Sequence, residues 1–128
     1  MALRIVRLGA DRLPDEGLRI GTVRRPPRGV RKADYASKNY YDVWLPILAP
    51  SLGLVKLALA SQTERDWNRF AKKYRLEVNG TDASALINTL AALSHHADFS
   101  VGCYCADEVR CHRSILRDLL LEGGAQIA

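Results

Sequence analysis

Three cysteines and one histidine lie within ten residues near the C-terminal end of this chain, at Cys103, Cys105, Cys111 and His112. A thiolate is a strong nucleophile and a good ligand for soft metals, and an imidazole can move a proton or bind a metal. A secreted disulfide scaffold would instead have an even number of cysteines spread along the chain. The cluster therefore indicates a chemical site rather than a set of disulfide bonds.

Positively charged and hydroxyl side chains accompany the second half of this cluster, at Arg110, Arg113 and Ser114. If a strand ends near Cys105 and a helix begins near Cys111, the free N–H groups of the first helical turn favour an anion there. The same positive field makes a nearby thiol more acidic. We therefore expect Cys105 or Cys111 to be a nucleophile or redox thiol, with His112 orienting the ligand or moving a proton.

The same residues are also compatible with other interpretations. A zinc ion would need all four side chains to converge, but the adjacent Cys111 and His112 lack the two-residue spacing of common zinc knuckles and no second C-x-x-C pair is present, so we predict no metal. A zinc or redox-sensing domain stays an alternative, with Cys105 and Cys111 as the redox pair. In the plainest interpretation Cys103 is a small buried hydrophobe and His112 is bonded to a backbone carbonyl. The pattern identifies no cofactor.

A second feature is a basic segment in the first quarter of the chain. Of the 19 Lys and Arg in the 128 residues, nine lie in residues 1–32, against three Asp and Glu there, and the net charge is +5. Five of these charges surround Pro26-Pro27, and arginine binds phosphate through two parallel hydrogen bonds. We predict that Pro27, Arg28 and Gly29 join the cysteine segment in one site for a nucleotide-like anion. This requires Arg28 to lie within roughly 15 Å of Cys105, the span of a nucleotide-sized ligand.

Two alternatives for the basic segment belong to other classes. A cluster of arginines is also the electrostatic signature of nucleic-acid binding, which would make the chain a non-enzymatic binding module for nucleic acid or protein. Aromatic residues suited to stacking on single strands occur only just downstream, at Tyr35, Tyr40 and Tyr41, so this interpretation is the less favoured one. The plainest alternative is a solvated loop.

Strand and helix patterns alternate along the chain and define the elements that must position these residues. The predicted strands cover residues 3–8, 18–23 and 98–105, with a short edge strand at 125–128, and the predicted helices cover 38–49, 52–59, 63–79, 82–93 and 111–122. Thr63 and Asp82 are the expected N-caps, and Asn79-Gly80 and Gly123-Gly124 the expected C-terminal stops. We expect one α/β domain over residues 1–128, with a mostly parallel sheet flanked by helices and its ligand at the carboxyl ends of the strands.

The composition excludes several classes of protein. Hydrophobic residues make up 48% and charged residues 26% of the chain, which are ordinary globular values rather than those of disordered or fibrous proteins. No apolar run approaches the roughly 20 residues of a membrane helix, and the first residues lack a signal core. We expect a cytoplasmic protein with no membrane partner. The oligomeric state is left open.

Four segments together resemble the domain-of-unknown-function family 488, in its YeaO-like branch. They are residues 24–32 (RRPPRGVRK), 42–51 (DVWLPILAPS), 67–77, and Cys105 with the element Cys111-His112-Arg113-Ser114. The branch usually has an aspartate-arginine-leucine-tryptophan stretch before its proline-arginine-glycine, and Arg24-Arg25-Pro26 stands in its place here. The resemblance implies a compact α/β fold and a small bacterial cytosolic protein, and it supplies no reaction.

Overall fold

Four parallel strands form the sheet in this computed structural model, which describes residues 1–128. In spatial order they are β1 (Leu3–Arg7), β4 (Phe99–Cys103), β2 (Leu18–Gly21) and β3 (Val43–Trp44). The register pairs Ile20 with Val101 and with Val43, so β4 and β2 are the central strands. The chain is therefore one compact α/β domain with a parallel sheet, as the sequence predicted.

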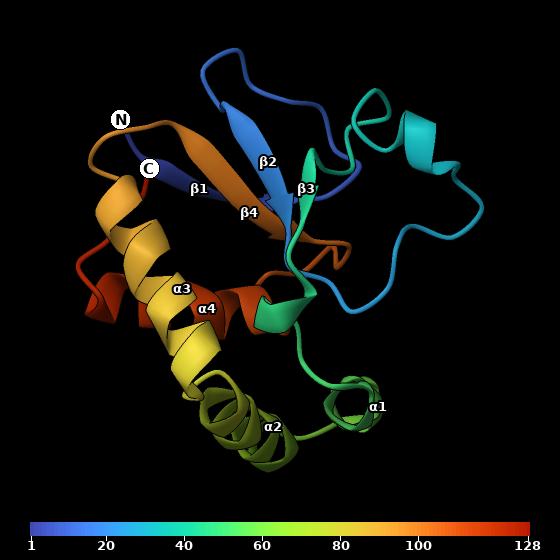
Figure 1. Ribbon diagram of the computed structural model, residues 1–128. Helices are drawn as coiled ribbons and strands as arrows, with labels where there is room; N and C mark the ends of the chain where they lie inside the picture. The colour runs from blue at the N-terminus through green and yellow to red at the C-terminus, as the bar shows by residue number, and fades with distance from the viewer.

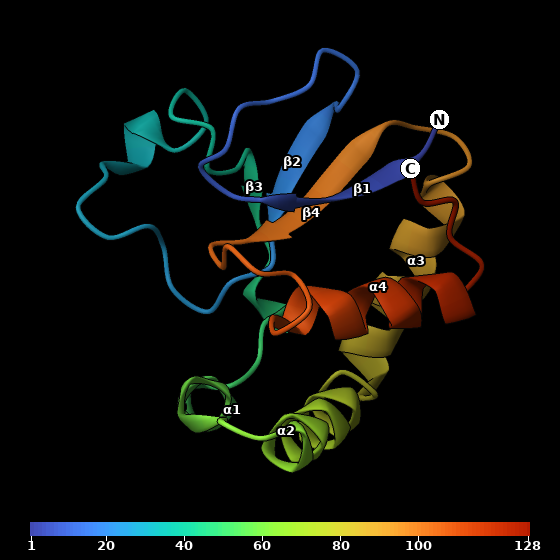
Figure 2. The same cartoon turned by 180° about the vertical axis from the view of Figure 1, so that it is seen from behind.

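The helices lie together on one side of this sheet. They are α1 (Leu52–Ala60), α2 (Glu64–Glu77), α3 (Thr81–Leu93) and α4 (His112–Glu122). In Figures 1 and 2, α3 and α4 run beneath the sheet, while α1 and α2 lie further from it. The largest core cluster fills the space between, with Phe99 and Val101 from β4 packed with Leu116 and Leu120 from α4. None of the helices is long and apolar enough to span a membrane.

Loops rather than helices cover the opposite face of the sheet. Strand residues alternate between the two faces, so Arg19 points away from the helices that bury Ile20. Arg19 forms a buried ion pair with Glu16, with Nε 2.8 Å from Oε2, and Nη1 donates to the backbone carbonyls of Ala10 and Asn39 at 2.8 and 2.6 Å. The pair therefore fastens two loop segments to β2 where a second helical layer would otherwise stand.

The helix predicted over residues 38–49 is wrong. This segment holds the short strand β3 and a 3-10 turn, η2 (Pro46–Leu48). Pro46 has no N–H to donate and biases the preceding residue towards extended backbone. The extended chain bonds instead to β2, with Leu45 N donating to the Gly21 carbonyl at 2.8 Å. The apolar residues of the segment 38–49 therefore pack against different parts of the protein and do not form one face of a helix.

Several strands end at other residues than the sequence predicted, and one of these differences affects the site. The strands predicted to reach residues 23 and 105 end at Gly21 and Cys103. Residues 125–128 form no strand and contribute one parallel bridge, between Ile127 and Leu3. Because β4 stops at Cys103, Cys105 lies in the loop that turns towards α4.

Helix caps agree with the sequence at two of four positions. Thr63 caps α2, accepting a hydrogen bond from Asp66 N at 3.1 Å, and Gly124 takes a left-handed φ of +91° after α4. Asp82 is not a cap, because α3 begins one residue earlier with Gly80 as its N-cap. Gly80 has φ −62°, so the expected left-handed stop after α2 is wrong as well.

Candidate functional site

A pocket of about 270 Å³ opens where β2 and β4 end and α4 begins. One wall is apolar and comes mainly from α1 and α2, through Leu52, Val55, Ala58, Leu59 and Phe70. The other wall carries the polar and reactive groups, Arg24, Arg25, Cys103, Cys105, Arg110, Cys111 and His112. The carboxyl ends of parallel strands are where α/β sheets usually bind ligands. Three cysteines and His112 of the predicted segment therefore line a pocket at the carboxyl ends of β2 and β4.

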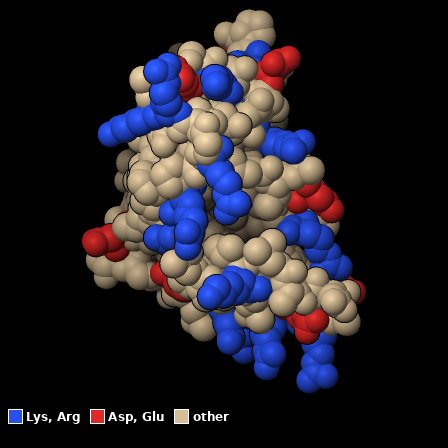
Figure 3. All heavy atoms as spheres, turned by 90° about the vertical axis from the view of Figure 1, so that its right-hand side faces the viewer, with Lys and Arg blue, Asp and Glu red and all other residues tan.

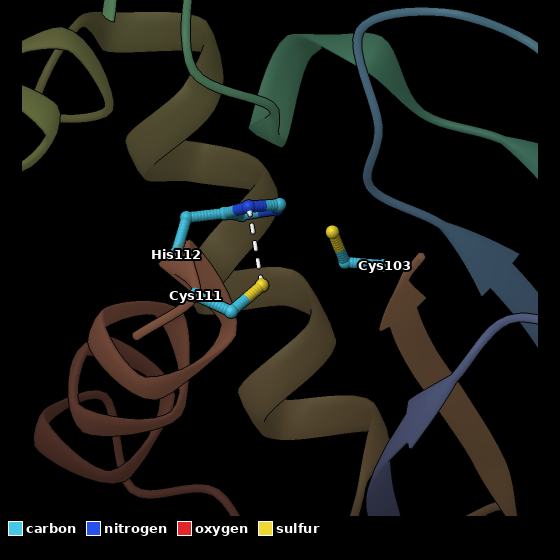
Figure 4. Close-up of side chains that lie close together, drawn as sticks. All are labelled: Cys103, Cys111 and His112. Carbon is cyan, nitrogen blue, oxygen red and sulfur yellow. Dashed lines mark hydrogen bonds between the residues drawn. The ribbon is translucent and has the colours of Figure 1, made fainter. Parts of the chain in front are cut away.

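The thiols and the imidazole converge in this wall. Cys103 Sγ lies 3.7 Å from Cys105 Sγ, and Cys111 Sγ lies 3.8 Å from His112 Nδ1. The ligating atoms of Cys103, Cys111 and His112 all lie within 4.8 Å of one another. Figure 4 shows the Cys103 and Cys111 side chains approaching from the end of β4 and the start of α4, with the His112 ring beside them. The cluster could bind a metal ion.

His112 is held in one orientation by its surroundings. Its Nε2 lies 2.7 Å from the backbone carbonyl of Thr22, which can only accept, so Nε2 carries the hydrogen. Nδ1 then presents a lone pair to Cys111 Sγ. The edge of the ring also meets Tyr74, whose hydroxyl donates to the Leu48 carbonyl at 2.6 Å. The expected bond between His112 and a backbone carbonyl is therefore present, and it leaves the second ring nitrogen free for the cluster.

The three thiols polarise one another. Cys103 donates a hydrogen bond to Cys105 at 3.7 Å and also adjoins Cys111, and these two neighbours raise its pKa. The hydrogen bond from Cys103 lowers the pKa of Cys105, and the neighbouring Cys111 and the Arg113 charge lower it further. The neighbouring Cys103 also lowers the pKa of Cys111, with help from His112. Cys105 and Cys111 are thus the thiolate-forming members, and of the three cysteines only Cys105 is exposed.

Arg113 and Ser114 support the loop between β4 and α4 rather than line the pocket. Arg113 is 3% exposed, and its Nη2 donates to the Cys105 carbonyl at 2.6 Å. Its Nε has no hydrogen-bond partner, and no carboxylate forms an ion pair with it. Ser114 Oγ donates to the Cys111 carbonyl at 2.9 Å. Both side chains therefore fix the positions of the thiols.

The predicted Pro27-Arg28-Gly29 loop lies beside the pocket rather than in it. Pro27 and Arg28 line a second, more open hollow with Arg7 and Tyr40, and Gly29 is exposed outside both hollows. Two residues, Arg25 and Tyr104, line both hollows. The sequence predicts one crevice, whereas the structure has two adjoining hollows that share Arg25 and Tyr104.

The three arginines that line the pocket differ in how far contacts within the protein already occupy their guanidinium groups. Arg24 is bonded to the carbonyls of Ala49 and Pro50, both at 3.0 Å, and so ties the β2 end to the segment before α1. The Arg110 guanidinium lies 5.8 Å from the centre of the Trp67 ring. Arg25 is exposed and makes no side-chain hydrogen bond within the protein. Figure 3 shows Lys and Arg outnumbering Asp and Glu on the face that carries α1 and the loop after β2.

The sequence did not identify every residue of this site. Cys103 is buried, as one interpretation of the sequence predicts, and its thiol also lies within 4.8 Å of the Cys111 and His112 donor atoms. The sequence places Arg24 and Arg25 in the basic segment considered for phosphate binding, but it does not distinguish them from the other charges there. Thr22 carries no sequence signal, because its contribution is a backbone carbonyl.

Comparison with known families gives one match. The model of the family DUF488-N3a, described as the active DUF488-N3 subclade, matches residues 3–124. The matched residues run from β1 to the end of α4 and include every residue of the cluster. No curated protein and no solved structure matches the chain.

Proposed function

Since the chain belongs to the DUF488 family, in the group described as the active DUF488-N3 subclade, we propose that its pocket is an active site for a small anionic, nucleotide-like molecule. The family membership agrees with the resemblance found in the sequence, and the YeaO-like branch is consistent with it. In this proposal the cysteines and His112 at the inner wall supply the reactive group, and the arginines at the rim hold the anion.

The observation that carries the proposal is the composition of the pocket. An apolar wall from α1 faces a wall with three thiols, one imidazole and three arginines. An apolar surface suits a base or another ring, and free guanidinium groups suit a phosphate or carboxylate. A volume of about 270 Å³ is close to the lower limit of roughly 300 Å³ for small-molecule sites. A single nucleotide or a smaller phosphate ester is therefore the ligand class that fits.

Each predicted residue has a role in this proposal. Cys105 is the thiol that reacts with the ligand, because Cys103 and Cys111 are buried. His112 Nδ1 accepts the proton of Cys111, 3.8 Å away. Arg25 and Arg110 bind the anionic group, and Arg28 meets any part of the ligand that extends into the second hollow. Gly29, with a left-handed φ of +74°, shapes the loop that carries Arg28. Arg113 and Ser114 are positioning residues.

Calorimetric titration with adenosine 5′-monophosphate and with inorganic phosphate tests the proposal. Replacing Arg25→Gln or Arg110→Gln should weaken binding of the nucleotide about tenfold or more, because a charge-assisted hydrogen bond contributes about 1.5–3 kcal/mol. Arg65→Gln is the matched control, since Arg65 is exposed on α2 outside the pocket. Absence of binding by the unmodified protein, or equal losses in all three variants, would contradict the proposal.

Nucleic-acid binding is the second candidate, favoured by the basic side chains that extend beyond the pocket. It predicts a different response to the same variants. A single-stranded oligonucleotide would bind with a strong salt dependence, and Arg65→Gln would weaken it as much as Arg25→Gln does. A mononucleotide would then bind poorly, which separates the two candidates.

A further inference from the structure

We propose that Cys103, Cys111 and His112 bind one zinc ion, and that Cys105 completes the coordination while no other ligand occupies the pocket. This reverses the prediction of no metal made from the sequence. It goes beyond the proposed function, because it assigns a resident metal to the cluster without requiring an anionic ligand.

The spacing of the donor atoms fits a tetrahedral ion. Zinc bonds sulfur at about 2.3 Å and imidazole nitrogen at about 2.0 Å, so a tetrahedron separates two sulfur atoms by about 3.8 Å and sulfur from nitrogen by about 3.5 Å. The observed separations are 3.7 Å between Cys103 and Cys105 and 3.8 Å between Cys111 and the His112 Nδ1 atom. Two thiols that form a hydrogen bond without a metal are separated by about the same distance, so the distance between one pair of atoms does not identify a metal site. The donor atoms of Cys103, Cys111 and His112 all lie within 4.8 Å of one another, as a metal site requires, and Cys105 adjoins this group through its contact with Cys103.

His112 has the orientation that zinc-bound histidines take. Such a histidine almost always donates its other ring N–H to a carbonyl or carboxylate, which fixes the tautomer and the ring plane. Here Nε2 donates to the Thr22 carbonyl at 2.7 Å, and Nδ1 faces the thiols. The adjacency of Cys111 and His112, which argued against zinc in the sequence, is accommodated because Cys111 precedes α4 as its N-cap while His112 is the first helical residue.

The charge of the surroundings also fits. Zinc with three thiolates and a neutral imidazole carries a net charge of −1. Arg113 is a buried cation with no carboxylate partner and with an unpaired Nε, and a buried charge without a counter-ion is costly. A thiolate-rich zinc centre beside the Cys105 loop supplies that counter-ion. The thiol protons leave to the solvent when the metal binds. His112 Nδ1 is then a zinc ligand, and it accepts the proton of Cys111 only in the metal-free site.

Cys105 is the replaceable ligand in this arrangement. It is exposed at the pocket and lies in the loop after β4, whereas Cys103 and Cys111 are buried. A molecule entering the pocket can therefore take its place on the metal. Zinc would also shield Cys105 from reagents whenever the pocket is empty.

Metal analysis of the full chain, purified under reducing conditions without chelator, tests the proposal. We expect one zinc per chain by plasma mass spectrometry, and the thiol count should rise by three when a strong chelator is added. Exchange into cobalt(II) should give intense sulfur-to-metal charge-transfer bands and the visible bands of a tetrahedral site. Absence of zinc, together with absence of cobalt bands in protein that is folded by circular dichroism, would overturn the proposal.

Variants test the assignment of each ligand. Cys111→Ser and His112→Gln should lose the metal, and His96→Gln should retain it, because His96 is exposed and lies outside the cluster. Cys105→Ser should keep zinc but release it to chelator faster, with weaker charge-transfer bands. Circular dichroism identifies any variant that fails to fold, and the cobalt spectrum of the unmodified protein gives an answer independent of the variants. Zinc retained in folded His112→Gln would contradict the ligand set, and complete loss in Cys105→Ser would contradict the replaceable ligand.

The failure of this inference is distinguishable from failure of the proposed function. Binding of adenosine 5′-monophosphate by chelator-treated protein, without any metal binding, would refute the zinc site alone. Stoichiometric zinc in a protein that binds neither the nucleotide nor phosphate would refute the anion site alone.

Discussion

The three cysteines of the site differ in what can reach them. Cys103 and Cys111 are 6% and 2% exposed, whereas Cys105 lies at the surface of the pocket. Cys103 donates a hydrogen bond to Cys105 and adjoins Cys111, and so lowers the pKa of both. His112 meets the cluster through one ring nitrogen and the backbone of Thr22 through the other. The proposed chemistry depends on four side chains whose positions come from β4, the loop after it and α4.

A buried residue pair on the other face gives a prediction about stability. Replacing Glu16→Gln leaves the Arg19 charge buried without its carboxylate, which typically costs about 3–5 kcal/mol. Urea unfolding should show a loss of this size in the free energy of unfolding. Asp15→Asn is the control, because Asp15 pairs with Arg4 at the surface and such pairs contribute less than about 1 kcal/mol. Equal losses in the two variants would mean that the buried pair is not what fastens the loops to β2.

At the scale of the elements, the site depends on where β4 stops and where α4 begins. The amphipathic spacing of α2 and α4 and the Thr63 cap were predictable, because these signals are local in the sequence. The two-residue strand β3 was not, because it exists only through bonds to β2. The convergence of Cys103 with Cys111 was not predictable either, because the loop 104–111 sets their distance and spacing alone does not determine loop geometry.

Replacing either of two glycines in these elements by alanine should change the stability of the protein, in opposite directions. A methyl group at Gly21 in β2 would lie 2.4 Å from the Tyr41 ring, and at Gly53 in α1 it would meet nothing within 4 Å. Gly21→Ala should therefore destabilise the protein by about 1–3 kcal/mol through overpacking. Gly53→Ala should stabilise it by roughly 0.5–1 kcal/mol, because alanine loses less backbone entropy in a helix. The midpoints of thermal unfolding should move in opposite directions, and a shift of the same sign would contradict this account of the packing.

At the scale of the whole molecule, the site lies at the edge of the main core rather than inside it. The largest core cluster, which joins the sheet to the four helices, contains none of the cysteines. The charge excess likewise does not cover the molecule, since residues 33–128 carry ten Lys and Arg against eleven Asp and Glu. The fold is thus expected to stand without the metal, and the basic segment to serve the pocket.

Removal of metal by a strong chelator tests whether the fold is independent of the metal site. The far-ultraviolet circular dichroism at 25 °C should stay unchanged, because the main core does not include the metal ligands. The midpoint of thermal unfolding should fall, since a ligand that binds only the folded state stabilises it. Loss of helical signal on chelation at 25 °C would instead make the cluster a structural requirement of the fold.

The most direct test of the central claim is site-resolved alkylation of the metal-free protein with iodoacetamide, followed by mass spectrometry of the three cysteine peptides. The account predicts that Cys105 reacts well before Cys103 and Cys111, and that adenosine 5′-monophosphate slows this reaction in the unmodified protein. In Arg25→Gln the same nucleotide concentration should protect much less. Equal labelling of the three cysteines, or labelling of Cys105 that saturating nucleotide does not change, would contradict the claim that this pocket brings a bound anion to a reactive thiol.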